Sequence, residues 1–395
     1  MNLILFDEPA IRINLLPFTF TRPVAKIRVG ILTITEKWER LLNTQASYLT
    51  NDYLSRKFPV SIASDNLLVN GAVCPDNSLL TAVTGLKDGE GLKKNDMVLA
   101  FRSAKATPEA VSVINFKPYA PDATLIDQPW KIFQHTAAEL RRDFSLITSG
   151  RKSEPITDPH TRVYNQANIF LESGVHLRAA VLNAEEGPIY LGKNTVIQEG
   201  ALIKGPFSLG EGSHINMGAK MRGDTTIGPY CKVGGEISNS VIFGYSNKAH
   251  DGFLGNSVIG EWCNLGADTN TSNLKNNYEN VKLWSYAKSG FANTGLQFCG
   301  LMMGDHSKCG INTMFNTGTV VGVSANIFGD GFPRNFIPSF AWGGASGFTT
   351  FQLAKAFETA EKVMVRRGLV LDDTDKEILK TIFNDTAINR IWEKK

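Results

Sequence analysis

One histidine stands in a setting that is suited to proton transfer. The chain of 395 residues has six histidines, and His250 follows a break in a regular repeat, within the stretch FGYSNKAHDGFLG. The unperturbed pKa of imidazole lies near neutral pH, so a histidine beside a loop can act as a general base. A solvated loop histidine without a catalytic role would have the same pattern. His250 is therefore a candidate base, and the alternative stays open at this point.

A second group of residues suited to chemistry lies near the amino terminus. Guanidinium and ammonium groups neutralise phosphate oxygens through charge-assisted hydrogen bonds. Four side chains of this kind occur within a short segment: Arg12, Arg22, Lys26 and Arg28. The segment FDEPAIR after the first apolar run has no glycine, so no glycine-rich loop holds phosphates there with its backbone amides. We expect these four cations to carry any nucleotide binding; solvated surface cations are the alternative.

A repeat of six residues predicts the architecture that must position His250. From Ile189 to Glu236 the third place of each six is always apolar, at Leu191, Ile197, Ile203, Leu209, Ile215, Met221, Ile227 and Val233. A period of six matches neither an amphipathic helix nor an alternating strand, and it is typical of a parallel β-helix. Glycines recur every eighteen residues, at Gly192, Gly210 and Gly228. This spacing predicts a triangular coil with the glycines stacked at one corner in a left-handed backbone.

Interruptions of the repeat predict where loops leave the prism. After Val233 the phase slips by two, and it resumes at Val241, Phe253, Ile259 and Leu265, with Asn247 and Thr271 off pattern. Residues 273–300 break the period and read as a long insertion, after which the sixes restart at Met303. Loops that leave a solenoid tend to carry function. His250, which follows the slip, is expected at such a loop.

The segments around the repeat predict the domain organisation. Residues 1–150 alternate short apolar runs with helical stretches, which is typical of an α/β domain, and residues 151–162 read as a polar linker. Residues 163–345 would form the β-helix. Residues 346–395 contain two amphipathic helices, which we expect to cap the open end of the prism. Helix starts are expected at Thr35 and, with a capping box, at Thr374.

Composition limits the classes of function. A net charge of +3 is too small to indicate binding to nucleic acid or to a membrane surface. No run of about 18 apolar residues is present, so no membrane-spanning helix is expected. The five cysteines include no CxxC pair, and we expect them to be reduced, which favours the cytoplasm. The opening MNLILF reads as a first strand rather than a signal peptide.

These motifs together resemble the family of bifunctional N-acetylglucosamine-1-phosphate uridylyltransferase/glucosamine-1-phosphate acetyltransferase proteins, in particular a bacterial branch with a short, divergent first domain. The family's K-A-G-H run contains the catalytic base, and this chain has Lys248-Ala249-His250-Asp251-Gly252. The family's N-I-G-A-G-T run is matched by Asn264-Leu265-Gly266-Ala267-Asp268-Thr269. A later family asparagine matches Asn273, and an upstream arginine that binds the sugar phosphate matches Arg222 within a couple of residues.

The resemblance implies a fold and an acetyl-transfer site. The fold would be an α/β nucleotidyltransferase-like domain followed by a left-handed parallel β-helix of hexapeptide repeats with C-terminal helices, assembled as a homotrimer. His250 would take a proton from the amine of glucosamine-1-phosphate, which attacks acetyl-CoA. Backbone amides at Gly266 and Ala267 would stabilise the developing oxyanion of the acyl-CoA thioester. The sugar phosphate would be bound by Arg222, Lys248, Asn264 and Asn273.

The resemblance also implies a nucleotidyl step in the first domain. A sugar-1-phosphate would attack UTP, with Mg²⁺ neutralising charge on the phosphates. The product class would be UDP-N-acetylglucosamine, a sugar nucleotide for the cell envelope. Arg12, Arg22, Lys26 and Arg28 would bind the nucleotide, whereas the residues that hold the metal cannot be assigned from the motifs.

Departures from the family pattern leave alternatives open. A sugar-contacting tyrosine is replaced by Phe253, and the phosphate-binding lysine falls at Ser238, so that Lys248 or Lys275 would have to replace its charge. The first domain lacks the family's G-x-G-T-R loop. The chain would then be an acyltransferase only, or a non-catalytic regulatory or assembly protein with a degenerate first domain. A zinc hydratase site is disfavoured because His214, His250 and His306 are 36 and 56 residues apart.

Overall fold

The computed structural model describes residues 1–106 and 108–393, which form two compact units. The first unit contains Met1–Leu15, Thr21–Ile27 and Leu32–Gln128. The second contains the chain from Pro129 onward together with two short N-terminal segments, Leu16–Phe20 and Arg28–Ile31. The boundary between the units therefore falls before the helix that ends near residue 150, and this helix belongs with the repeats.

The first unit is an α/β domain built on a six-stranded mixed sheet in the order β2-β1-β3-β6-β5-β7. Its strands are β1 (Asn2–Phe6), β2 (Ala46–Leu49), β3 (Asn66–Asn70), β5 (Glu90–Lys94), β6 (Met97–Ser103) and β7 (Asn115–Pro118). Strand β1 is parallel to β2 and β3, and β6 is antiparallel to β3 and β5. A small separate pair is formed by β4 (Val73–Cys74) and β8 (Thr124–Leu125).

Four α-helices belong to this unit: α1 (Pro9–Asn14), α2 (Ile34–Leu42), α3 (Asp52–Ser55) and α4 (Asn77–Thr84). Helix α2 starts one residue earlier than predicted. Thr33 is its N-cap and forms a reciprocal capping box with Glu36. Thr35, the predicted cap, is buried and donates its hydroxyl hydrogen bond to the carbonyl of Ala25.

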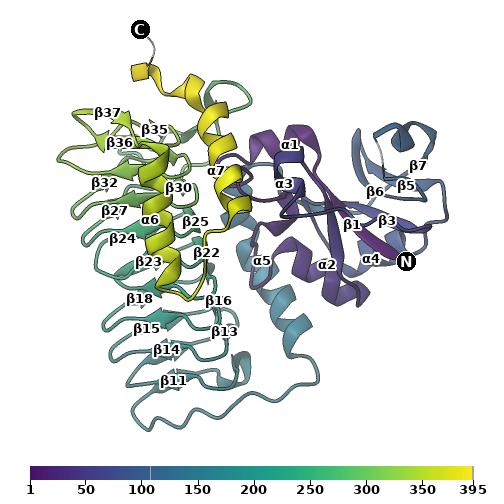
Figure 1. Cartoon of the computed structure of the whole chain (residues 1–395). Helices are drawn as coiled ribbons and strands as arrows, with labels where there is room; N and C mark the ends of the chain where they lie inside the picture. The colour runs from purple at the N-terminus through teal and green to yellow at the C-terminus, as the bar shows by residue number, and fades with distance from the viewer. Residues whose placement is uncertain (107, 394–395) are drawn as a thin grey trace. The chain divides into compact units, whose positions relative to one another are not determined.

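The second unit is a parallel β-helix with three faces, whose stacked strands appear in green in Figure 1. The first face contains β10 (Ile169–Leu171), β13 (Ile189–Leu191), β16 (Phe207–Leu209), β19 (Thr225–Ile227), β22 (Val241–Gly244), β25 (Val258–Glu261), β30 (Met302–Met303), β33 (Val320–Val321) and β35 (Phe336–Ile337). The second face contains β11 (His176–Leu177), β14 (Val196–Ile197), β17 (His214–Ile215), β20 (Lys232–Val233), β23 (Asn247–Lys248), β26 (Asn264–Leu265), β31 (Lys308–Cys309), β34 (Asn326–Ile327) and the hairpin β36 (Ala341–Gly344) and β37 (Gly347–Thr350).

The third face contains β9 (Arg162–Tyr164), β12 (Val181–Asn183), β15 (Leu202–Lys204), β18 (Lys220–Met221), β21 (Glu236–Ser238) and β24 (Phe253–Gly255), with β27 (Asn270–Thr271) and β32 (Met314–Phe315) paired beyond them. Helix α5 (Pro129–Thr148) packs against β19, β22 and β25 of the first face. Among the helices in the described ranges, none is both long and apolar enough to cross a membrane.

The predicted register of the regular coils is confirmed. Leu191 pairs with Leu209 and Leu209 with Ile227, so each coil contains eighteen residues. All eight apolar positions of the repeat are buried inside the prism. The glycines stack as predicted, but for a different physical reason. An added Cβ at Gly210 would lie 2.5 Å from the carbonyl carbon of Gly228, so these glycines allow close approach between coils. The left-handed positions lie two residues later, at Asn194, Gly212 and Tyr230.

The phase slip after Val233 begins in one short corner. Of the expected continuation, Ile259 and Leu265 are buried in the core as predicted, and the other two positions are wrong by one residue. Four residues separate Ile215 from Lys220 at an ordinary corner, whereas only Gly234 and Gly235 separate β20 from β21. Val233 pairs with Lys248 and Ile237 with Leu254, so the inward positions are Ile242, Lys248 and Leu254. The predicted Val241 and Phe253 are each one residue too early.

The insertion and the C-terminal helices complete the second unit. Residues 273–300 leave the prism, as predicted, and form the antiparallel hairpin β28 (Lys282–Ser285) and β29 (Gly290–Asn293). Helix α6 (Leu353–Val365) runs along the side of the prism rather than across its end (Figure 1). Helix α7 (Asp373–Asp385) is capped by Asp372, not by the predicted Thr374. Phe348 of β37 and Trp392 pack against the core at the end of the prism.

Candidate functional site

His250 is exposed at the corner between the second and third faces and lines a groove of about 770 Å³. The corners of several successive coils form this groove. The lining residues are Gln198, Asn216, Met217, Gly234, Gly235, Ala249, His250, Asp251, Ala267 and Asp268. Two of the residues that the sequence analysis assigned to acetyl transfer, His250 and Ala267, therefore lie in one groove.

The groove exists because one corner is two residues short. Gly234 and Gly235 turn directly from β20 into β21, while the next coil keeps a full corner from Ala249 to Gly252. A Cβ at Gly235 would lie 2.7 Å from the carbonyl oxygen of Gly252, and Gly235 has a φ of +68°. Glycine is thus required on both steric and conformational grounds. The full corner projects beyond the short one and presents the imidazole of His250 to the hollow.

Lys248 holds this projecting corner from inside the prism, which differs from the predicted role in substrate binding. Its side chain is 2% exposed and occupies an inward position that is apolar in the coils above and below, at Leu265 and Val233. Its ammonium donates to the carbonyl oxygens of His250 at 2.8 Å, Gly234 at 3.3 Å and Asp251 at 3.3 Å. Lys248 therefore positions the backbone of His250 and has no open path to a substrate in the groove.

Burial lowers the pKa of Lys248 to about 8, although the charge of nearby Asp251 opposes the shift. A buried ammonium loses hydration, and three carbonyl oxygens restore only part of it. The side chain keeps its positive charge below that pKa and loses it at moderately alkaline pH. The hydrogen bonds that hold the His250 corner are therefore strongest below about pH 8.

The charges that line the groove are acidic. Asp251 and Asp268 are exposed on either side of the His250 corner, and among the described residues that line the groove none is Lys or Arg. A sugar phosphate would find no cation in this groove within one chain.

The two predicted oxyanion donors differ in availability. The amide of Gly266 donates to the carbonyl of Cys309 at 3.1 Å and is part of the ladder between coils, so it cannot bind a ligand. The amide of Ala267 has no acceptor among the described residues, and Ala267 lines the groove. Of the predicted pair, only Ala267 can serve as a donor to a bound thioester.

The remaining predicted substrate residues lie outside the His250 groove. Arg222 forms an exposed ion pair with Glu236 at 3.2 Å, just past the end of β18. Asn273 donates to the side chain of Asn256 at 2.8 Å, at the same far end of the third face. Asn264 begins β26 and pairs with Asn247, at the start of the second face. The sequence analysis missed Met217, Gly235 and Asp268, whose place follows only from the stacking of corners.

In the first unit a buried carboxylate ties the predicted nucleotide-binding segment together. Asp7 lies directly after β1, where ligands bind in many α/β sheets. It accepts hydrogen bonds from Arg12 at 3.2 Å, from the Thr50 hydroxyl at 2.6 Å and from the amide of Val24 at 2.8 Å. Arg12 also donates to Tyr53 at 2.7 Å, so its guanidinium is engaged within the unit.

The other three cations have different environments. Arg22 is buried, and its carbonyl accepts a hydrogen bond from Arg12 at 3.2 Å. The Lys26 ammonium lies 5.2 Å from the ring centroid of Tyr48 and is half-buried. Arg28 belongs to the second unit, where it donates to the carbonyl of Phe243 at 3.3 Å. Arg22 and Lys26 are thus the predicted residues that share the first unit with Asp7 and Arg12.

The described side chains do not build a metal site. Within residues 1–106 and 108–393, no group of three or more His, Cys, Asp or Glu side chains is placed to hold a metal ion. Asp7, which is next to the predicted nucleotide segment, already accepts three hydrogen bonds. Mg²⁺ commonly takes most of its ligands from substrate phosphates and water. Any Mg²⁺ here would depend on the nucleotide rather than on a preformed protein site.

The pKa of Lys248 leads to a prediction about stability. Above pH 8 the folded protein loses the Lys248 proton, whereas the unfolded chain keeps it to about pH 10.4. The unfolded chain then binds more protons, so the free energy of unfolding rises with pH in this window. Lys248→Met removes this titration. We expect the wild-type value minus the Lys248→Met value to increase by on the order of 1–3 kcal/mol from about pH 7.5 to about pH 10, measured by urea unfolding.

The exposed lysine of β18 provides the matched control, because Lys220→Met removes a solvated ammonium from the same prism. The free energy of unfolding of Lys248→Met should depart from the wild type with pH more than that of Lys220→Met does. The same pH dependence in the two variants would show that Lys248 titrates as a solvated lysine.

Comparison with known proteins finds similarity to sugar nucleotidyl transferases and to bifunctional proteins that act on sugar phosphates. Residues 3–152 match the family model described as "Sugar nucleotidyl transferase". The bifunctional protein GlmU of Methanocaldococcus jannaschii is 34% identical over 87 residues, which cover 22% of this chain and 21% of that protein. A bifunctional sugar-1-phosphate nucleotidylyltransferase/acetyltransferase of Sulfurisphaera tokodaii is 33% identical over 93 residues, or 24% and 23% of the two chains. The matched segments thus span about a fifth of these curated relatives.

A solved structure of an Arabidopsis UDP-N-acetylglucosamine acyltransferase aligns with 60% of this chain and 94% of its own, at 15% identity and a TM-score of 0.25. The assignment of the β-helix therefore depends on the strand pairing of this chain itself. The chain is similar to sugar nucleotidyl transferases over residues 3–152 and to GlmU-type bifunctional proteins over a shorter segment, which confirms the family resemblance that its motifs indicate.

Proposed function

We propose that the β-helix unit transfers an acetyl group from acetyl-CoA to the amine of glucosamine-1-phosphate, with His250 as the general base. The observation that carries this proposal is the hollow at the short Gly234–Gly235 corner, into which a positioned His250 projects. Ala267, whose amide has no acceptor among the described residues, lines the same hollow. A base and an oxyanion donor on one groove are the two groups that acyl transfer to an amine requires.

The reaction would proceed by attack of the sugar nitrogen on the thioester carbonyl carbon. The new C–N bond forms as His250 accepts the proton of the amine, and the charge on the carbonyl oxygen is stabilised by the Ala267 amide. The C–S bond then breaks, and the thiolate of coenzyme A leaves and takes up a proton. Asp251 and Asp268 stabilise the imidazolium while it carries the transferred proton.

The phosphate of the acceptor sugar needs a cation that the groove of one chain lacks. Arg222 is an exposed candidate, and it lies at a different corner of the same prism. A cyclic arrangement of copies would bring one corner of each prism to another corner of its neighbour. We therefore propose a homotrimer in which Arg222 of one chain faces the His250 groove of the next, and in which exposed Met217 becomes buried.

A second activity, nucleotidyl transfer from UTP to a sugar-1-phosphate, is favoured by the match of residues 3–152 to sugar nucleotidyl transferases. Arg22 and Lys26 belong to the same unit as Asp7 and Arg12, and the carbonyl of Arg22 accepts a hydrogen bond from Arg12. The product class would be a UDP-amino sugar used for the cell envelope. Because acetyl-CoA and UTP are metabolites of the cytoplasm, the proposal also places the protein there.

Substitution of the base tests the acetyl-transfer proposal. Because a general base contributes about 10²–10⁴-fold to rate, His250→Gln should lower kcat for glucosamine-1-phosphate by that order. Acetyl-CoA affinity and melting temperature should stay close to wild type, since His250 is exposed. His176→Gln, an exposed histidine of β11 outside the groove, is the matched control and should keep full activity. A folded His250→Gln protein with wild-type turnover would show that His250 has no catalytic role.

Calorimetric titration of UTP with Mg²⁺ tests the second activity. Loss of a charge-assisted hydrogen bond costs about 1.5–3 kcal/mol, so Arg22→Ala and Lys26→Met should each weaken UTP binding by at least about tenfold. Lys105→Met removes an exposed lysine of the same unit and should have no effect. Absence of UTP binding in the wild type would instead support a first unit that is regulatory or structural.

A further inference from the structure

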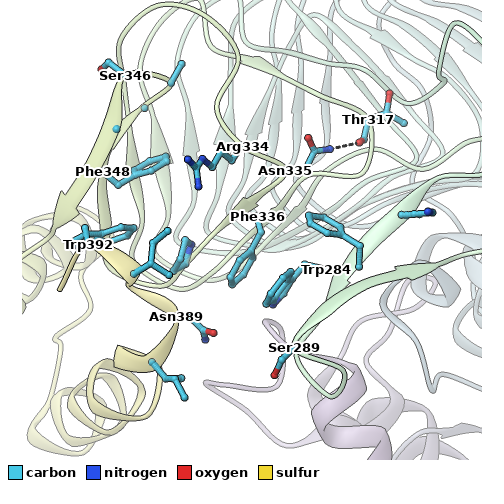
Figure 2. Close-up of a pocket in the computed structure, with 18 of the residues that line it drawn as sticks. Trp284, Ser289, Thr317, Arg334, Asn335, Phe336, Ser346, Phe348, Asn389 and Trp392 are labelled. Atoms are coloured by element: carbon cyan, nitrogen blue, oxygen red, sulfur yellow. Dashed lines mark hydrogen bonds between the residues drawn. The ribbon is translucent and has the colours of Figure 1, made fainter. Parts of the chain in front are cut away.

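A second, larger hollow of about 1180 Å³ lies in the β-helix unit and shares no lining residue with the His250 groove. Figure 2 shows its walls, which come from segments distant in sequence. One side is formed by the insertion hairpin β28–β29 and by β35, and the other by the β36–β37 hairpin and residues 388–392. Neither the repeat nor the acetyl-transfer motifs account for this hollow.

Aromatic side chains form two walls of the hollow. Trp284 stacks on Phe336 with ring centroids 4.1 Å apart, and on the other side Phe348 and Trp392 lie 5.9 Å apart. Part of this apolar lining is in contact with solvent: the side chain of Phe291 is 50% exposed. Aromatic surface of this extent is normally covered in a soluble protein, and its exposure in a concave site indicates a ligand with an apolar body.

All charged side chains that the structure places along the hollow are basic: Lys275, Lys282 and Arg334. Lys275 is 3.8 Å from the carboxylate of Glu279. Lys282 and Arg334 are exposed and form no ion pair with any residue that the structure describes. Two uncompensated cations beside an apolar surface attract an anion and would be neutralised by it.

Trp284 contributes the face of its ring to the hollow rather than a polar group. Its indole Nε1 is buried and has no acceptor among the described residues, so this donor is not accessible to a ligand. The hollow therefore offers apolar walls and two cations that form no ion pair among the described residues.

We propose that this hollow binds an amphipathic anion, namely an acyl chain that ends in a carboxylate or a phosphate. The chain would lie between the Trp284–Phe336 and Phe348–Trp392 walls, where removal of its methylenes from water stabilises the complex. The head group would pair with Lys282 and Arg334. The volume exceeds that of most small-ligand pockets, which suits a chain of many carbons better than a compact sugar.

The probe for this site is 1-anilinonaphthalene-8-sulfonate, an aromatic anion whose fluorescence rises in apolar pockets. Decyl phosphate and decanoate, both below their micelle concentrations, should displace it from the wild-type protein. Decanol lacks the charge and should bind at least about tenfold more weakly, as expected for one lost charge-assisted hydrogen bond. Stronger displacement by ATP than by decyl phosphate would assign the hollow to nucleotides and overturn the proposal, as would a failure of every acyl anion to displace the probe.

Variants separate this hollow from other apolar surface. The double variant Lys282→Gln/Arg334→Gln should bind decyl phosphate about 10–100-fold more weakly than the wild type, and its affinity for decanol should be unchanged. Phe291→Ala should weaken the binding of both decyl phosphate and decanol. Because the Phe291 side chain is exposed, this variant should still fold. Lys193→Gln with Lys220→Gln removes two exposed cations elsewhere on the prism and is the matched control. Equal affinity in the Lys282/Arg334 double variant and the wild type would overturn the proposed head-group site.

Discussion

The stacking of each coil on the one before is the constraint on which this protein depends. Strand amides bond to the next coil, so the ladder that joins Leu191, Leu209 and Ile227 fixes where every strand lies. A coil can therefore depart from its neighbours only at a corner. At Gly234–Gly235 the departure is a loss of two residues, which leaves the ladder intact and opens a hollow beside it. The site is thus a local change in length within a regular scaffold.

The buried Lys248 holds the backbone of the residue that lines the hollow. Burying the Lys248 ammonium in a position that is otherwise apolar costs free energy, and three carbonyl oxygens offset part of that cost. One of those carbonyls belongs to His250, so the charge that weakens the core also fixes the residue that faces the hollow. Strain and buried charge are often concentrated at functional sites in this way, where the surrounding structure can sustain them.

The regular part of the prism could be predicted residue by residue, because every inward position from Leu191 to Val233 is apolar and evenly spaced. Prediction failed where the spacing changed. Inward positions follow at Ile237 and Ile242, four and then five residues on, and an error of one residue turns every side chain to the opposite face. The inward position was therefore sought at Asn247, and Lys248 was assigned to binding of the sugar phosphate instead. Asn264 lies fourteen residues after His250, which is less than one full coil. It pairs with Asn247 at the start of the second face, whereas His250 lies at the corner that ends this face.

Whether two chains share one acetyl-transfer site is tested most directly by mixing two inactive variants. His250→Gln lacks the proposed base, and Arg222→Ala lacks the cation that we propose binds the sugar phosphate. When the two are co-refolded in equal amounts into a cyclic trimer, about one interface in four combines an intact His250 with an intact Arg222 of its neighbour. We expect each variant alone to be nearly inactive and the mixture to recover about a quarter of wild-type acetyl transfer. No recovery in a mixed trimer, or a monomer mass by light scattering, would contradict a site shared between chains.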